Sequence, residues 1–164
     1  MSKIVVAAAQ IRSTPDLDDN LRQALDAITL AAQRGARIVV LPEATSTSFA
    51  INPAKGAQPL DGPFASAIRQ AAAAAGVTVI VGLFEPAADG RVHNTLLVTG
   101  PGVEASYRKV HLFDAFDTVE SDTVAAGAGF VVVDIEGVKV GLATCYDVRF
   151  AAQFSALGRM GAEV

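Results

Sequence analysis

One cysteine, Cys145, stands where a short apolar segment gives way to helical spacing. Residues 138–144 are apolar and partly β-branched, which predicts a buried strand that ends at this thiol. A thiol between a strand and a helix projects from a sharp turn, close to the first free N–H groups of the helix. Those donors help to hold a thiolate and then an oxyanion, so the pattern predicts a nucleophile. The alternative is a small buried hydrophobic residue, which is the common role of a lone cysteine.

Two charged side chains occupy positions from which they could assist a nucleophile. Glu43 ends a second apolar run, directly after Pro42, and a carboxylate at a sheet edge beside apolar walls can act as a general base. Lys109 lies inside a predicted strand, where an inward-facing ammonium would stabilise an oxyanion and lower the pKa of a nearby thiol. Each residue also has a plainer interpretation: a solvated acid at a strand end, and a lysine that faces solvent.

The two histidines offer a second kind of chemistry. His111 is expected to face the same side of its strand as Lys109, so a Cys–His pair is an alternative, although no residue that would orient the imidazole is evident. His93 has no companion and is interpreted as structural. The histidines are far apart and no paired His/Cys spacing occurs, so the sequence predicts no metal site and no cofactor.

Alternating strand and helix patterns must bring these residues together. Asp16 or Asp18 caps a helix that stops at Gly35, and Asp61-Gly62-Pro63 begins another that runs to Gly76. Two strand–helix units followed by hairpin-linked strands and a last helix indicate an α/β fold, a mixed β-sheet with helices on one face. The expected strands cover residues 4–11, 36–41, 77–84, 93–98, 105–112, 130–135 and 138–144; the last helix covers 148–160, and 44–60 and 113–128 are irregular, the former as a surface loop.

Composition excludes several classes of partner. The chain has 164 residues, 51% hydrophobic and 18% charged, which is typical of a globular protein and sufficient for one domain. A net charge of −4 without a lysine or arginine cluster argues against nucleic acid and acidic membrane surfaces. No apolar run is long enough to span a bilayer. The single cysteine excludes an internal disulfide and suits the reducing cytoplasm.

Three motifs taken together carry a family resemblance. They are Leu41-Pro42-Glu43, the segment from Tyr107 to Leu112 that reads YRKVHL, and the segment from Cys145 to Phe150 that reads CYDVRF. In this order and spacing the chain closely resembles the nitrilase superfamily of carbon–nitrogen hydrolases. The tyrosine–aspartate pair after the cysteine is similar to the amidase branches, notably the ω-amidase-like ones, whereas true nitrilases usually carry Trp-Glu there.

The resemblance implies roles for particular residues. Cys145 would attack an amide carbonyl after Glu43 accepts its proton, and Lys109 with the backbone N–H of Tyr146 would hold the oxyanion. A thioester would form as ammonia leaves, and Glu43 would then activate water to release the acid. A further family glutamate that orders the site best matches Glu120, by its place between the lysine and cysteine motifs.

The implied substrate is a small aliphatic amide or an ω-amide, bound without a cofactor. Phe49, Phe113 and Phe116 are candidate walls of its pocket. One departure concerns the family's glutamate after Arg-Phe-Pro, because here Phe150 is followed by Ala151-Ala152-Gln153.

The family fold continues well past Val164, so the resemblance implies that residues 1–164 are the N-terminal portion of a single carbon–nitrogen hydrolase domain. Further residues would complete its α-β-β-α sandwich and dimer contact, and a homo-oligomer, a dimer or higher, is expected. The alternative to an enzyme is a catalytically inactive half-domain that works only with a partner or with the remaining part. The sequence also predicts that several apolar side chains of the last hairpin lack a cover, namely Val132, Ile135, Val140 and Leu142.

Overall fold

A five-stranded mixed sheet forms the centre of the computed structural model, which describes residues 4–164. The first three strands in sheet order are parallel, and the next two add as antiparallel neighbours. The mixed sheet and the antiparallel pairing of its last strand are therefore confirmed. The strands lie in the order β1 (Val6–Ala8), β2 (Ile38–Val40), β3 (Thr78–Pro86), β4 (Val92–Gly100) and β5 (Val103–Arg108).

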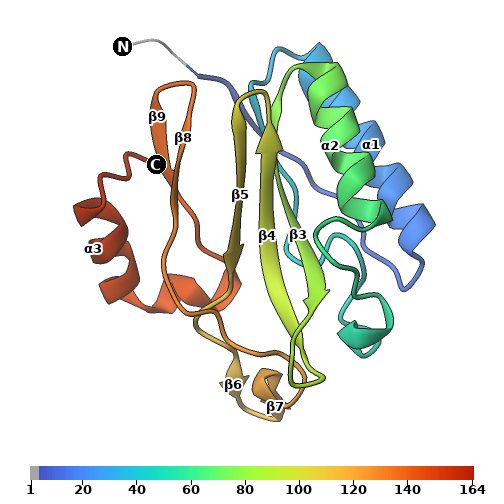
Figure 1. The fold of residues 1–164 in the computed structure, drawn as a ribbon, viewed down its shortest axis with the longest axis vertical. Helices are drawn as coiled ribbons and strands as arrows, with labels where there is room; N and C mark the ends of the chain where they lie inside the picture. The colour runs from blue at the N-terminus through green and yellow to red at the C-terminus, as the bar shows by residue number, and fades with distance from the viewer. Residues whose placement is uncertain (1–3) are drawn as a thin grey trace.

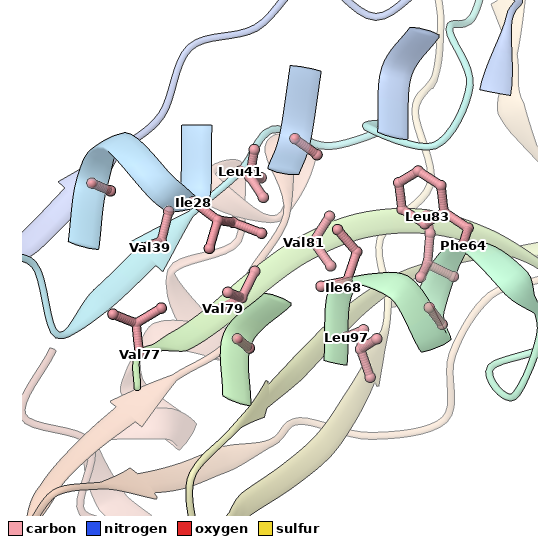
Figure 2. Close-up of a cluster of buried hydrophobic side chains, with 14 of the residues drawn as sticks. Ile28, Val39, Leu41, Phe64, Ile68, Val77, Val79, Val81, Leu83 and Leu97 are labelled. Carbon is pink, nitrogen blue, oxygen red and sulfur yellow. The ribbon is translucent and has the colours of Figure 1, made fainter. Parts of the chain in front are cut away.

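Two helices, α1 (Leu17–Gln33) and α2 (Pro63–Ala75), lie side by side on one face of this sheet (Figure 1). The Asp16 carboxylate accepts the first free N–H groups of α1, and Gly76 closes α2 in the left-handed conformation. Both helices start and stop where the sequence predicts. Figure 2 shows the apolar core between these helices and the sheet, which includes Ile28, Val39, Leu41, Phe64, Ile68, Val77, Val79, Val81, Leu83 and Leu97.

A separate hairpin, β8 (Val132–Ile135) and β9 (Val138–Gly141), covers the opposite face of the sheet, and α3 (Ala151–Arg159) packs outside it (Figure 1). Helices, sheet, hairpin and helix thus give the layers of an α-β-β-α sandwich. The expectation that this hairpin lacks a cover is wrong for three of its four apolar side chains, because packing against the sheet buries them. Ile135, Val140 and Leu142 are buried in a cluster with Ile38, Ile80, Leu96, Val98, Tyr107 and Val133. Val132 is half-buried and lies outside this cluster.

The first strand differs from its prediction. It is shorter than residues 4–11, and Val5 just before it and Val6, its first residue, are about half exposed, at 50% and 49%. β1 lies at the edge of the sheet, where no strand among residues 4–164 pairs with its other side. An apolar run alone does not distinguish an edge strand from a central one.

Two segments predicted as irregular contain more structure than expected. The loop after β2 is buried at its start, from Ala44 to Thr47, and forms a short 3-10 helix, η1 (Pro53–Lys55). The acidic segment after Lys109 folds into β6 (Asp114–Ala115), β7 (Thr118–Val119) and the 3-10 helix η2 (Glu120–Asp122). No helix within the described part of the chain is long and apolar enough to cross a bilayer.

The cysteine turn is the most consequential difference. Instead of one helix over residues 148–160, a five-residue 3-10 helix, η3 (Cys145–Arg149), precedes α3, which begins only at Ala151. Cys145 itself has φ of +48°, a left-handed conformation that is uncommon outside glycine. The thiol is therefore presented by a strained turn and a short 3-10 helix, whose dipole is weaker than that of the predicted α-helix.

Candidate active site

Four predicted side chains meet at one end of the central sheet. The Lys109 ammonium nitrogen Nζ lies 3.0 Å from Glu43 Oε1 and 3.0 Å from Glu120 Oε2, so it bridges the two carboxylates. Cys145 lines the same cavity of about 420 Å³ as these three residues. The fold therefore brings together the nucleophile, acid–base and cation positions inferred from sequence, while their catalytic roles stay a prediction.

Glu43 is placed by a close approach of two backbones. A Cβ at Gly82 would lie 2.6 Å from the Pro42 carbonyl oxygen and 2.7 Å from Glu43 Cα, so only glycine lets β3 pass this closely beneath the carboxylate. Thr45 holds the following turn by donating from its hydroxyl to the Pro42 carbonyl at 2.7 Å. The base position thus depends on a glycine 39 residues beyond it in the chain.

Lys109 follows β5 rather than lying inside it, which corrects the predicted strand over residues 105–112. Its backbone N–H still donates to the Asn94 carbonyl at 2.8 Å, and its side chain is almost fully buried. Burial alone would lower the pKa of the ammonium, but the nearby Glu43 and Glu120 carboxylates outweigh that effect and raise it. The side chain therefore carries its positive charge across the physiological range.

Glu120 is a buried carboxylate with donors on both oxygens. Lys109 donates to each of them, and the Phe113 backbone N–H donates to Oε2 at 2.6 Å. The segment from β6 to η2 folds around these bonds. The match of Glu120 to the family's ordering glutamate therefore has the geometry that such a role needs.

Asn94 on β4 is a site residue that sequence reasoning missed. Its amide nitrogen Nδ2 donates to Glu43 Oε1 at 2.7 Å and approaches Glu120 Oε1 at 3.4 Å. The signal that could have found it is a fully buried asparagine in a strand that is otherwise largely apolar.

The Cys145 thiol is more strongly protonated than expected. The residue is exposed overall, but partial desolvation of its sulfur is the largest effect and raises the pKa; the Glu43 carboxylate raises it further, while Lys109 and the Tyr146 backbone N–H lower it by less. The lowering of the thiol pKa expected from Lys109 and the backbone N–H groups is therefore outweighed. A thiol beside a carboxylate that can take its proton is the arrangement of a nucleophile activated by a general base.

A buried carboxylate, Asp147, pins the cysteine turn to the lysine segment. It accepts from the Thr144 backbone N–H at 2.9 Å, from Tyr107 Oη at 2.6 Å and from the ring nitrogen Nδ1 of His111 at 2.9 Å. The His111 ring also stacks on Phe150, with centroids 3.7 Å apart. Asp147 thus orients the imidazole, so the geometry favours this pair over the alternative of a Cys–His pair.

The other sequence candidates fall into different places. Phe49 and Phe113 line the cavity, as predicted. Phe116 does not: it is 97% exposed at the turn between β6 and β7, where its own φ is +56°. His93 bonds the Ala125 carbonyl through Nδ1, a structural role. The described residues include no group of three or more His, Cys, Asp or Glu side chains arranged to hold a metal ion.

Comparison with known proteins places this site in a family. Residues 5–164 match the family model of carbon–nitrogen hydrolases. The chain belongs to the carbon–nitrogen hydrolase family. Solved members of the nitrilase superfamily share its fold: Nit3 of Saccharomyces cerevisiae is 26% identical with a TM-score of 0.83, over 97% of this chain and 61% of that one.

Several relatives of this carbon–nitrogen hydrolase are named as hydrolases or amidases. A Mycobacterium tuberculosis hydrolase is 47% identical, over 97% of this chain and 58% of its own length. An omega-amidase of Xenopus laevis is 34% identical, over 92% of this chain and 58% of its length. A mutant of an amidase from Nesterenkonia sp. AN1, solved after Michael addition of acrylamide at its active-site cysteine, is 25% identical with a TM-score of 0.83, over 98% of this chain and 64% of that one. The chain spans about three fifths of the length of these relatives.

The Asp147 contacts predict a pH-dependent contribution to the stability of the folded chain. Burial raises the pKa of Asp147, but hydrogen bonds from Tyr107, Thr144 and His111 outweigh it and lower the pKa below the ordinary 3.8. Because the pKa of Asp147 is lowered in the folded state, its ionised carboxylate stabilises the fold fully at pH values well above 3.8. This stabilisation declines near pH 3.8 and is lost as the pH falls through the folded-state pKa.

We therefore expect Asp147→Asn to lower the free energy of unfolding by at least about 1.5–3 kcal/mol at neutral pH, and by less in acid. Urea denaturation at pH 7 and at pH 3 measures both differences. Asp134→Asn is the matched control, because Asp134 accepts one backbone N–H in the exposed β8–β9 turn. An equal loss of unfolding free energy at pH 7 and pH 3 would contradict a lowered pKa of Asp147.

Proposed function

We propose that this protein hydrolyses the carbon–nitrogen bond of a small amide to an acid and ammonia, through a thioester on Cys145. One observation carries the proposal: the Lys109 ammonium bridges the Glu43 and Glu120 carboxylates beside the only thiol in the chain. Membership of the carbon–nitrogen hydrolase family and the amidase names of its relatives support the same reaction.

The first half-reaction needs a nucleophile, a base and a charge-stabilising group. Glu43 takes the proton from Cys145 Sγ as the sulfur–carbon bond forms. Lys109 and the Tyr146 backbone N–H stabilise the oxyanion, since fixed donors aimed at developing charge supply much of the rate in acyl transfer. Glu43 then returns the proton to the departing nitrogen, which leaves as ammonia.

The second half-reaction consumes the thioester. Glu43, ionised again after ammonia departs, accepts a proton from water as the water oxygen attacks the thioester carbonyl. Collapse of the tetrahedral intermediate breaks the carbon–sulfur bond, and the proton returns to Cys145 Sγ. The acid leaves, and no cofactor takes part in this proposal.

The cavity favours a neutral aliphatic acyl group. Its walls are mostly apolar, and Lys109 is the one cation among the described residues that line it. That ammonium is shared by two carboxylates, so the lining has a net negative formal charge. A carboxylate at the far end of an ω-amide would be repelled. The ω-amide remains the second candidate, because relatives are named omega-amidases.

Ammonia release from propionamide, the monoamide of succinic acid and propionitrile tests the proposal. We expect turnover of propionamide with kcat/KM at least about tenfold above that of the monoamide, a difference of about 1.4 kcal/mol. Higher activity on the monoamide would establish the ω-amide instead. Ammonia from the nitrile alone would contradict amide hydrolysis. A folded chain that releases none would favour the inactive half-domain.

The cellular compartment of the protein, its oligomeric state and the extent of its domain are also proposals. We propose that the protein works in a reducing compartment such as the cytoplasm, since catalysis rests on one free thiol. We further propose a homo-oligomer, in which residues 1–164 supply the N-terminal portion of a single hydrolase domain. Sedimentation velocity decides the assembly: a species of two or more chains is expected, and a monomer at all concentrations would contradict it.

A further inference from the structure

Asn94 contacts both carboxylates of the site and the backbone of Lys109. Its amide donates to Glu43 Oε1 and reaches Glu120 Oε1, and its backbone carbonyl accepts the Lys109 N–H. The residue is only 1% exposed and lies near the start of β4, paired with Phe84 of β3. The Asn94 side chain therefore contacts both glutamates, and its carbonyl holds the backbone of the residue that carries the cation.

The orientation of the Asn94 amide is dictated by its neighbours. Ionised carboxylate oxygens only accept hydrogen bonds, so Nδ2 must face them. The Asn94 oxygen Oδ1 then points away and has no hydrogen-bond partner within the described residues. A buried polar atom without a partner is unfavourable, and such an atom in a native structure calls for an explanation. The bonds to the two glutamates provide one.

The bonds to Glu43 are asymmetric. Asn94 and Lys109 both donate to Oε1, at 2.7 and 3.0 Å, whereas no hydrogen bond from either reaches Oε2. A carboxylate held through one oxygen cannot rotate without breaking two bonds, one of them charge-assisted. Its other oxygen is the one left to receive a proton.

We propose that Asn94 is a positioning residue that clamps Glu43 through Oε1, so that Oε2 is the oxygen that exchanges a proton with Cys145. The inference rests on the proposed function and specifies its base. As the Sγ–H bond breaks, the Oε2–H bond forms. The same proton later passes from Oε2 to the leaving nitrogen, and Oε1 stays bound to Asn94 and Lys109 throughout.

Two variants separate positioning from packing. Asn94→Ala removes the clamp, and Asn94→Asp keeps the shape but replaces the donor with a third carboxylate. Thr95→Val is the matched control: Thr95 is the next residue on β4, is fully buried and donates to a different carboxylate, Glu85 Oε1, at 2.7 Å. Circular dichroism and thermal melting establish that each variant is folded.

The first readout is steady-state turnover of propionamide. We expect Asn94→Ala to lower kcat about 10- to 100-fold with KM changed less than about twofold, because a misplaced catalytic group slows chemistry more than it weakens binding. Asn94→Asp should lower kcat at least as far, and Thr95→Val should stay close to wild type. Variants that are folded and lose no more kcat than Thr95→Val would overturn the proposal.

The second readout needs no amide hydrolysis. Iodoacetamide labels the single cysteine, and its rate against pH reports how readily Glu43 draws the proton from the thiol. We expect the acid limb of this profile to move to higher pH in both Asn94 variants, because the ionised base loses a donor. An unmoved limb would overturn the positioning role. A shifted limb in a protein that hydrolyses no amide would support the clamp and reject the proposed function.

Discussion

Replacing Cys145 with alanine is expected to abolish ammonia release while the protein stays folded. Without the sulfur no thioester can form, and the loss should exceed the 10²–10³-fold that follows removal of a single oxyanion donor. The side chain is exposed and small, so its truncation should cost no more than about 1 kcal/mol of stability.

Turnover of propionamide by Cys145→Ala, together with a thermal melt, measures both effects. Cys145→Ser is the companion variant: it keeps a nucleophilic atom of poorer reactivity on the same strained turn. We expect no turnover from the alanine variant and residual turnover at most from the serine variant. Wild-type turnover by the alanine variant would contradict covalent catalysis at this position.

Replacing Lys109 with methionine is expected to damage both activity and stability. The ammonium is the charge that two buried carboxylates share, and removing one member of a buried ion cluster leaves unpaired charge at a cost of about 3–5 kcal/mol. The same change removes an oxyanion donor, so kcat should fall about 10²–10³-fold or more.

Urea denaturation and steady-state kinetics measure the two losses. Arg108→Met is the matched control, since it removes the neighbouring cation from an ion pair with Glu85 that is about half exposed on the arginine side. A second variant, Lys109→Met with Glu120→Gln, should recover part of the stability and none of the activity. A single Lys109→Met variant as stable as Arg108→Met would contradict the shared-charge arrangement.

The site's local ingredients could be read from the sequence because each follows a regular element. Glu43 and Cys145 each follow an apolar run, so the strand pattern places both just beyond the end of a strand. The predicted strand around Lys109 differs from the structure at its end: β5 stops at Arg108, one residue before the lysine. The lysine backbone still donates a hydrogen bond to β4. Element types were therefore more predictable than their ends.

The features that could not be predicted depend on contacts distant in the chain. The Cys145 turn is held by Asp147, whose partner Tyr107 is 40 residues away, and no local pattern distinguishes that turn from a helix start. Asn94 reaches Glu43 across 51 residues. Phe116 is a different case: it is exposed at the tight β6–β7 turn, which its aromatic character does not suggest.

The measurement that tests the central claim most directly is the mass of the protein during turnover. Wild type and Glu43→Gln, which slows both formation and hydrolysis of the thioester, are quenched in acid after mixing with propionamide and digested for peptide mass analysis. The account predicts that the peptide containing Cys145 gains the mass of the amide minus ammonia, and that hydroxylamine removes the gain. Ammonia release by a wild type whose Cys145 never carries the acyl group would contradict it.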